Sequence, residues 1–310
     1  MAALIAPRPA AIGYRPSMSN ALRLLLPALL LLQWLVAQAG EATRAPTRIH
    51  VIGASVSGGF EDGPLFGAER EGDSIALYRV WQRWAGDRAR VSTHAPVEMC
   101  GMFRDPSRIG RREIDVARRK RPDVVLAVDF LFWFAYGYVA GDEALARRQR
   151  LQEGLSLLDE LDVPMVLGDL PDMRGAATRM LRPAQVPSAP VLAALNEQVR
   201  AFAKARPEVA LVPLSEMVSE LRVTGVTLPL SRGAVKTAPL ALLQPDQLHA
   251  NRLGVAYVAF RLQRAVQQRL PSAHPLARRA WSFDDFVEAA GAVDQPALSA
   301  PAGGASGGRR

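Results

Sequence analysis

The stretch T-R-I-H-V-I-G-A-S-V-S-G-G-F-E-D, residues 47–62, decides how the rest of the chain is interpreted. Arg48 to Ile52 alternates polar and apolar residues and is rich in β-branched side chains, which is typical of a strand. Gly53 then opens a run of small residues where this strand should end. A small-residue turn at the carboxyl edge of a parallel sheet lets a side chain point into the crevice where open α/β sheets bind ligands, and free N–H groups face the same point. Ser55 lies on this turn and is therefore a candidate nucleophile.

Three sharper motifs compete for the same stretch, and none of them fits it. A phosphate-binding loop needs a lysine and a serine or threonine directly after Gly58, but glycine and phenylalanine stand there. The dinucleotide pattern G-x-G-x-x-G fails because Ser55 occupies its second glycine. The elbow G-x-S-x-G fails because Ser57 occupies its last position. A plain turn that ends a buried strand remains the alternative to a catalytic turn.

Strand-like apolar runs alternate with helix-like amphipathic segments along the rest of the chain. The length of 310 residues and the apolar content of 49% suit one α/β domain with appendages. We expect further strands at 90–93, 124–128, 165–167 and 209–212, and helices at 74–85, 109–120, 143–161, 191–205 and 255–270. The alternation predicts a three-layer α/β/α sandwich of flavodoxin-like order with about five parallel strands.

A second motif, Q-P-D-Q-L-H-A-N-R-L-G at residues 244–254, precedes the last long helix. Its histidine, His249, can act as a general base toward Ser55. Asp246, one turn away, can fix the tautomer of the imidazole and stabilise its protonated form. The bare D-x-x-H pair is unspecific because it arises easily by chance.

Taken together, the two motifs resemble the first and last blocks of the SGNH, or GDSL-like, hydrolases. In that family Gly-Asp-Ser-Leu is followed closely by serine or threonine and glycine, and here Ala54 replaces the aspartate. The last block resembles D-x-L-H-P-N-x-x-G, with Ala250 in place of the proline. The resemblance covers about residues 47–270 and implies an esterase or acyl hydrolase with Ser55, Asp246 and His249 as catalytic residues. It implies no metal and no organic cofactor.

The same resemblance implies an oxyanion hole and also exposes a departure from the family. The N–H groups of Ser55 and Gly101 are the expected donors, with Gly101 in a loop between the second strand and the next helix. The family's third block, Gly-x-Asn-Asp, is replaced by D-F-L-F-W-F-A-Y-G, and residues 129–140 contain no asparagine. Losing such a donor costs about 3 to 4 kcal/mol of transition-state stabilisation. Either another group substitutes for it or the activity is weak.

Aromatic residues fill the segment that replaces the third block. Phe130, Phe132 and Trp133 follow the third strand and are candidate substrate-binding residues. Packing as core beneath a loop is an equally good interpretation of the same residues. Farther along, Asp169 and Asp172 follow the fourth strand in G-D-L-P-D and are either a functional pair or ordinary turn residues.

The N-terminal segment indicates export. Leu24 to Val36 is a leucine-rich run preceded by Arg23, and Ala37-Gln38-Ala39 supplies the small residues that signal peptidase reads. The run is too short for a membrane span of about 20 residues. We expect a signal peptide over residues 1–39, with Met18 as a possible true start. The single cysteine, Cys100, cannot form an internal disulfide, which suits a periplasmic or secreted protein of a bacterial envelope.

Charge and composition indicate which partners and which domain limits to expect. The formal net charge is +8, and it becomes +5 when the three arginines of residues 1–39 are removed. Arginines at 111–121 and 147–150 fall in helix-like segments, where solvated helix faces explain them, so we expect no nucleic-acid partner. The expected substrate is a small-molecule or polysaccharide ester. We expect the hydrolase domain over 47–272, a packed helix over 273–290 and a disordered tail over 291–310.

Two other functions remain open at this point. Acetyl transfer to or from an envelope polysaccharide uses the same chemistry as ester hydrolysis. A non-catalytic envelope binding protein on the same fold would explain Ala54 and the missing asparagine, but it has no evident need for the base and its partner at Asp246 and His249.

Overall fold

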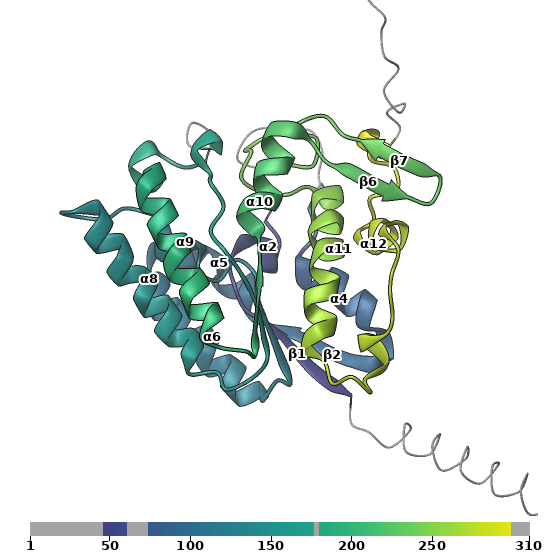
Figure 1. Cartoon of the computed structure of the whole chain (residues 1–310), viewed down its shortest axis with the longest axis horizontal. Coiled ribbons are helices and arrows are strands. Elements are labelled where there is room, and N and C mark those ends of the chain that lie inside the picture. The colour runs from purple at the N-terminus through teal and green to yellow at the C-terminus, as the bar shows by residue number, and fades with distance from the viewer. Residues whose placement is uncertain (1–45, 61–73, 177–179, 299–310) are drawn as a thin grey trace, which may run out of the picture. The chain divides into compact units, whose positions relative to one another are not determined.

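A five-stranded parallel sheet forms the centre of the computed structural model, which describes residues 46–60, 74–176 and 180–298 (Figure 1). Its order is β2-β1-β3-β4-β5, with every neighbouring pair parallel. The strands are β1 (Thr47–Val51), β2 (Ala89–Thr93), β3 (Val124–Ala127), β4 (Met165–Gly168) and β5 (Val209–Val212). The predicted α/β class, strand number and flavodoxin-like order are confirmed.

The centre of the sheet determines where a site can lie. β1 pairs with β2 on one side and β3 on the other, so the chain reverses its direction of winding between β1 and β3. Open α/β sheets bind ligands at such a switch point, outside the carboxyl ends of the strands. All residues of β3 and β4 are buried, as expected for parallel strands covered on both faces.

Two helix layers cover the sheet. In Figure 1, α6 (Pro106–Lys120), α8 (Glu143–Asp159) and α9 (Ala189–Lys204) lie on one side, and α4 (Leu77–Ala85), α11 (Arg252–Arg269) and α12 (Phe283–Ala290) lie on the other. In the second layer Trp81 packs edge-on against Phe286, with ring centroids 6.1 Å apart. Trp84 Nε1 donates to Gln263 Oε1 at 3.3 Å. The contact of Trp81 with Phe286 packs α12 on α4; this helix begins at Phe283, whereas it was expected over residues 273–290.

Side-chain caps explain where several helices begin. Asp105 accepts a bond from the N–H of Arg108 at the start of α6, and Asp142 starts α8 in the same way. Asn251 accepts from the N–H of Gly254 at 2.9 Å, so it begins α11 two residues after His249. Ser282 caps α12.

Shorter elements connect the main ones. They are α2 (Ser55–Gly58), α5 (Ala95–Arg104), α7 (Phe132–Ala135), α10 (Leu214–Ser219), a π-turn at Glu220–Thr224, 3-10 turns at Gly86–Arg88, Arg174–Ala176, Pro183–Gln185, Pro275–Ala277 and Pro296–Leu298, and the hairpin β6 (Thr227–Leu230) with β7 (Gly233–Lys236). The hairpin was not predicted, because residues 223–243 show no clear period.

The expectations for the two ends of the chain have different outcomes. The predicted signal peptide at 1–39, its alternative start at Met18 and residues 299–310 lie outside the described residues. The expected disorder is wrong for residues 291–298, since Leu298 is buried and its carbonyl accepts a bond from Arg232 Nη2 at 2.6 Å. No helix among the described residues has the length and apolar content needed to cross a membrane.

Candidate active site

Ser55 is the first residue of α2, three residues beyond Ile52, at the carboxyl end of β1. Gly53 makes the turn possible, because its φ is +148°, a conformation that residues with a side chain rarely adopt. A Cβ at Gly53 would also lie only 2.1 Å from Asp129 Oδ1. The backbone conformation and the packing therefore both require glycine at this position. The turn places the partly exposed Ser55 at the switch point of the sheet.

The buried carboxylate of Asp129, just beyond the end of β3, accepts three N–H groups of this turn. Oδ1 accepts from the N–H of Ala54 at 3.1 Å. Oδ2 accepts from the N–H groups of Val56 at 2.8 Å and Ser57 at 3.2 Å. Sequence analysis missed this role, because the residues that Asp129 holds lie more than 70 positions earlier in the chain.

The N–H of Ser55 is the exception in the turn. The N–H of Gly53 donates to Glu113 Oε2 at 2.8 Å. The N–H of Gly58 donates to the carbonyl of Ala54 at 2.9 Å, and the N–H of Gly59 donates to the carbonyl of Ser55 at 2.8 Å. Within the described part of the chain, the N–H of Ser55 has no acceptor. A free N–H beside a candidate nucleophile is the donor that an oxyanion requires.

Ser57, the second serine of the motif, has a different environment. Its side chain is fully buried, and its Oγ donates to Asp129 Oδ1 at 2.6 Å. A buried hydroxyl that is committed to a carboxylate cannot reach a substrate. Of the two serines, only Ser55 has the exposure that a nucleophile needs.

The histidine motif forms the second half of the site. Asp246 is fully buried and its Oδ1 accepts from the N–H groups of Leu248 at 2.9 Å and His249 at 3.0 Å. Its Oδ2 bonds to Nδ1 of His249. Burial alone raises the pKa of Asp246, but the hydrogen bond and charge of His249, with the two N–H groups, outweigh burial and lower the pKa. The ionised carboxylate only accepts, so in the neutral form of the imidazole Nδ1 carries the proton and Nε2 presents a lone pair.

The backbone of this motif is held from several sides. The N–H of Gln244 donates to the carbonyl of His249 at 2.8 Å, which closes the loop. Gln247 has a φ of +56°, and its carbonyl accepts from Arg222 Nη1 at 2.5 Å. Asn251 then caps α11. These bonds fix the backbone on both sides of His249.

Phe60 joins the serine turn to the histidine loop. Its ring stacks on the imidazole of His249, with centroids 4.3 Å apart and planes inclined by 29°. Its carbonyl accepts from Gln244 Nε2 at 2.8 Å. The structure therefore brings together the two predicted motifs, although no hydrogen bond joins Ser55 Oγ to His249 Nε2 among the described residues. Such bonds are often long before substrate binds.

Gly101 does not occupy the expected loop. It is the seventh residue of α5, a helix that begins at Ala95, directly after the segment that follows β2. An N–H in the interior of an α-helix points along the axis toward the carbonyl four residues earlier. The expected loop is wrong, and the position of Gly101 gives no support to its role as an oxyanion donor.

The three candidate substrate-binding aromatics have different environments. Phe130 is fully buried and packs on Phe134, with centroids 5.4 Å apart, so its assignment to a binding surface is wrong. Trp133 is 7% exposed. Phe132 is partly exposed and stacks on Tyr136 at 4.2 Å. Of these three aromatic residues, only Phe132 has enough exposed surface to contact a ligand.

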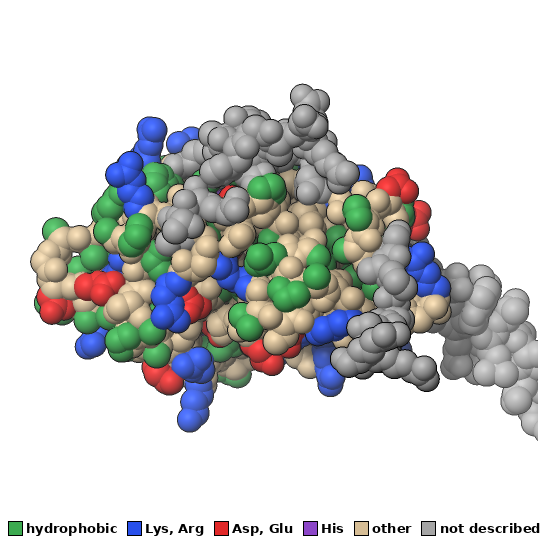
Figure 2. Space-filling view, turned by 90° about the horizontal axis from the view of Figure 1, so that it is seen from above, with side chains coloured by type: hydrophobic (Ala, Val, Ile, Leu, Met, Phe, Trp, Pro, Cys, Tyr) green, Lys and Arg blue, Asp and Glu red, His purple; other side chains and the backbone are tan. Residues whose placement is uncertain are grey.

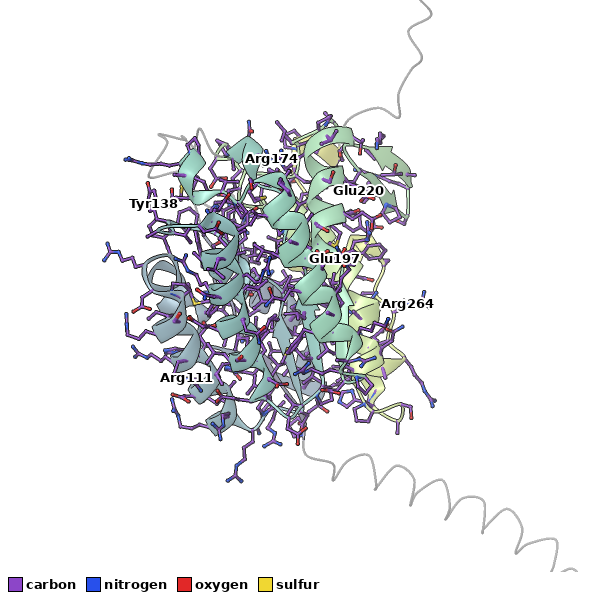
Figure 3. The ribbon with its side chains drawn as sticks, turned by 60° about the vertical axis from the view of Figure 1, so that its left-hand side comes forward. Arg111, Tyr138, Arg174, Glu197, Glu220 and Arg264 are labelled. Atoms are coloured by element: carbon purple, nitrogen blue, oxygen red, sulfur yellow. The ribbon has the colours of Figure 1, made fainter. Side chains whose placement is uncertain are left out.

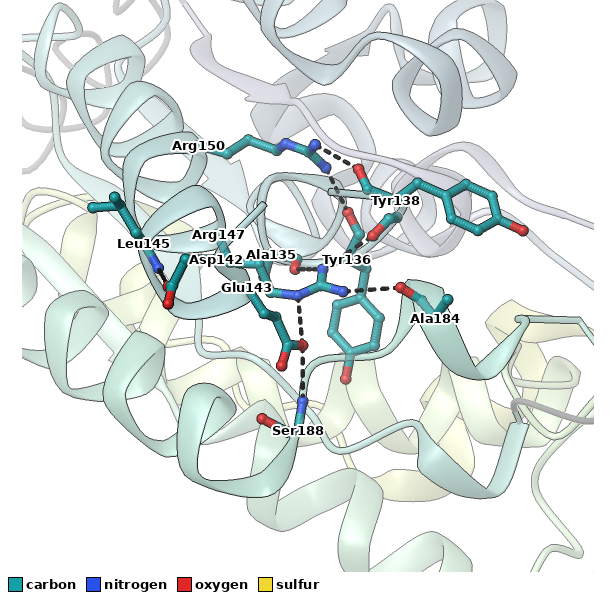
Figure 4. A network of polar contacts seen from close by, with 11 residues as sticks. Ala135, Tyr136, Tyr138, Asp142, Glu143, Leu145, Arg147, Arg150, Ala184 and Ser188 are labelled. Atoms are coloured by element: carbon teal, nitrogen blue, oxygen red, sulfur yellow. Dashed lines mark hydrogen bonds and ion pairs between the residues drawn. The ribbon is translucent and has the colours of Figure 1, made fainter. Parts of the chain in front are cut away.

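Two arginines of α8 hold the backbone that follows these aromatics (Figure 4). Arg147 is 1% exposed, so its predicted place on a solvated helix face is wrong. Its guanidinium donates to the carbonyls of Ala135 at 2.6 Å, Gly137 at 3.1 Å and Ala184 at 3.2 Å, and it pairs with Glu143. Arg150 donates to the carbonyls of Tyr136 and Tyr138. The two arginines thus hold the backbone of residues 135–138 near the carboxyl edge of the sheet.

The second acidic pair has structural partners. Asp169 accepts from the N–H of Ser215 at 2.6 Å and from its Oγ at 2.7 Å, which starts α10. Asp172 forms an exposed ion pair with Arg174, which lies at the upper end of the molecule in Figure 3. The interpretation of these residues as turn and capping residues accounts for both. Figure 2, which looks onto this end, shows basic side chains scattered among acidic and apolar ones.

Metal ligands are not clustered in the part of the chain that the structure describes: no group of three or more His, Cys, Asp or Glu side chains there could hold a metal ion.

Comparison with known proteins yields distant structural likenesses. No family model matches the chain, and no curated protein matches it. A gut microbial diltiazem-metabolizing enzyme is 15% identical with a TM-score of 0.44, over 72% of this chain and 47% of that one. An acetyl xylan esterase is 17% identical with a TM-score of 0.41, over 71% and 99%. This chain thus spans about half of the first protein, and its α/β class follows from its own sheet.

Proposed function

We propose that the protein is an SGNH-like serine hydrolase that acts on an ester or O-acetyl group, with Ser55 as nucleophile, His249 as general base and Asp246 as the residue that orients the base. The observation that carries the proposal is the buried pair of Asp246 and His249, in which the carboxylate holds Nδ1 and leaves Nε2 available. The contact of Phe60 with His249 supports the proposal, because Phe60 follows the serine turn closely in the chain and packs on the ring of the proposed base.

The chemistry proceeds in two transfers. His249 Nε2 takes the proton of Ser55 Oγ as the oxygen attacks the ester carbonyl carbon, and the carbonyl oxygen becomes an oxyanion that the N–H of Ser55 can stabilise. Return of the proton to the leaving alkoxide breaks the C–O bond and leaves an acyl-serine. A water molecule then gives its proton to Nε2 and attacks the acyl group, and Ser55 regains its proton as the acid leaves.

The oxyanion hole is expected to be weak. Among the described residues the N–H of Ser55 has no acceptor, Gly101 lies inside a helix, and residues 129–140 contain no asparagine. Removing one donor from a hydrolase lowers kcat by about 100- to 1,000-fold. We therefore expect slow turnover of activated esters, and we expect labelling reagents to detect the site more readily than steady-state assays.

Substrate and location belong to the same proposal. A small-molecule or polysaccharide ester fits the proposed chemistry, and acetyl transfer differs only in whether water or a sugar hydroxyl accepts the acyl group. Periplasmic or secreted location rests on the signal peptide predicted at residues 1–39.

The decisive experiment is labelling of the purified protein with a fluorophosphonate probe, followed by peptide mass spectrometry. We expect one label, on Ser55, and no label in Ser55→Ala or His249→Ala while circular dichroism remains unchanged. The two substitutions together should be no worse than either alone, because the residues act as one unit. Labelling that persists in Ser55→Ala contradicts the assignment, and a folded wild-type protein that takes no label favours the binding-protein alternative.

A further inference from the structure

We propose that Asp129 is the positioning residue of the nucleophile turn. Its carboxylate accepts hydrogen bonds from the N–H groups on both sides of Ser55. The N–H of Ser55 is thereby left without a protein acceptor in the described part of the chain and can donate to the oxyanion. The inference rests on the proposed role of Ser55 as nucleophile.

The carboxylate collects four donors from one short turn. Oδ1 accepts the N–H of Ala54 and the Oγ–H of Ser57, and Oδ2 accepts the N–H groups of Val56 and Ser57. Asp129 itself is 6% exposed, so these bonds replace the water that a carboxylate requires. The donors flank Ser55 on both sides of the chain, while its own N–H stays without an acceptor among the described residues.

The turn is shaped to hold this carboxylate. Gly53 lacks the Cβ that would come within 2.1 Å of Asp129 Oδ1, and its N–H is directed instead to Glu113 Oε2 at 2.8 Å. Two buried acids from different elements, α6 and the end of β3, thus bind the same turn. Most of this turn is buried away from water, so its N–H groups need acceptors from the protein, and these two acids supply them.

Placement on β3 gives these bonds a geometric consequence. β3 lies beside β1 in register, with Val51 opposite Leu126, so Asp129 extends from a fixed strand toward the end of its neighbour. The position of Ser55 is therefore set by the sheet and not by α2, which has only four residues. Displacement of a reacting atom by about 1 Å can lower a rate about a hundredfold.

A neutral amide cannot replace the carboxylate fully. Asparagine offers one acceptor oxygen and an NH2 group that only donates. With the oxygen placed toward Val56 and Ser57, the NH2 would face the N–H of Ala54, donor against donor. The turn must then shift, and the shift moves the residue between Ala54 and Val56, which is Ser55.

A buried acid can also stabilise a fold without positioning anything, and a matched residue separates these roles. Asp169 lies at the end of β4, is 5% exposed, and binds the N–H and Oγ of Ser215 at 2.6 and 2.7 Å. It holds α10 and has no contact with the serine turn among the bonds described. Asp129→Asn and Asp169→Asn are therefore the same chemical change at two neighbouring strand ends.

The test compares these variants in the full-length protein. We expect Asp129→Asn to lower the rate of fluorophosphonate labelling and the kcat for p-nitrophenyl acetate by about 30- to 100-fold, with KM within about threefold. Asp169→Asn should lose a similar amount of thermal stability and keep its labelling rate within about threefold. Equal labelling rates in the two variants overturn the inference alone. Wild-type protein that is not labelled at Ser55 overturns the proposed function and this inference with it.

A second measurement does not depend on whether Asp129→Asn folds. Residue-resolved amide exchange of the wild-type protein should show protected N–H groups at Ala54, Val56 and Ser57 and an unprotected one at Ser55. Phosphonylation of Ser55 should then protect its N–H, because the phosphonate oxygen occupies the oxyanion position. Protection of the Ser55 N–H in the free protein, or no change on phosphonylation, overturns the inference.

Discussion

His50 on β1 predicts a specific dependence of stability on pH. Its imidazole is fully buried, its Nδ1 lies 2.9 Å from Ser92 Oγ on β2, and its Nε2 has no partner among the described residues. Burial, and then the charges of Lys120 and His94, lower its pKa from 6.5 to about 4. The folded protein therefore resists protonation at a pH where the unfolded chain already binds the proton, so acid favours unfolding.

The size of the effect follows from the two pKa values. One unit of pKa corresponds to about 1.4 kcal/mol, so His50 should lower the free energy of unfolding by about 2 kcal/mol at pH 5 and about 3 kcal/mol at pH 4. The contribution is absent above pH 7, begins near the unfolded pKa of 6.5, and is complete below the folded pKa of about 4.

Urea denaturation of wild-type protein and His50→Gln between pH 7.5 and 4.5 measures the effect. Glutamine does not titrate and keeps a group that can bond to Ser92, so the difference between the two curves isolates the histidine. We expect the wild type to lose stability faster than the variant as pH falls below 6.5. Parallel curves over this range would show that His50 is protonated as easily in the folded protein as in the unfolded chain.

Two further substitutions test the site geometry. Phe60→Ala removes the ring that stacks on His249; because such contacts are worth about 0.5–1.5 kcal/mol, the labelling rate should fall by up to about tenfold, and an unchanged rate would contradict a role in holding the base. Gly53→Ala forces a Cβ to within 2.1 Å of Asp129 Oδ1 at a φ of +148° and should cost about 3 kcal/mol or more of stability. Its control, Gly86→Ala, has a φ of +53° with a ψ of −135° and open space around the Cβ, so it carries backbone strain of about 1 to 3 kcal/mol without a clash. Gly53→Ala should therefore cost more stability than Gly86→Ala, and equal thermal shifts for the two variants would refute the clash.

Local sequence patterns predicted the elements of the fold and the histidine half of the site. Alternation in the first strand and short apolar runs in the others identified all five strands to within about two residues, because the local pattern of side chains indicates a strand. Asp246 and His249 were predicted to interact because they lie three positions apart, about one turn of chain, and the loop that carries them is closed by the bond from the N–H of Gln244 to the carbonyl of His249.

The tertiary structure alone decided how the serine half is held. Asp129 meets Ala54 across 75 positions, and Gln244 meets Phe60 across 184. Parallel pairing brings the ends of distant strands to one edge, and no local pattern records which side chains converge there. The predicted loop at Gly101 and the predicted solvated face at Arg147 were wrong for a similar reason. The sequence gives the type of each residue, but only the structure shows that the N–H of Gly101 lies inside a helix and that the side chain of Arg147 is buried.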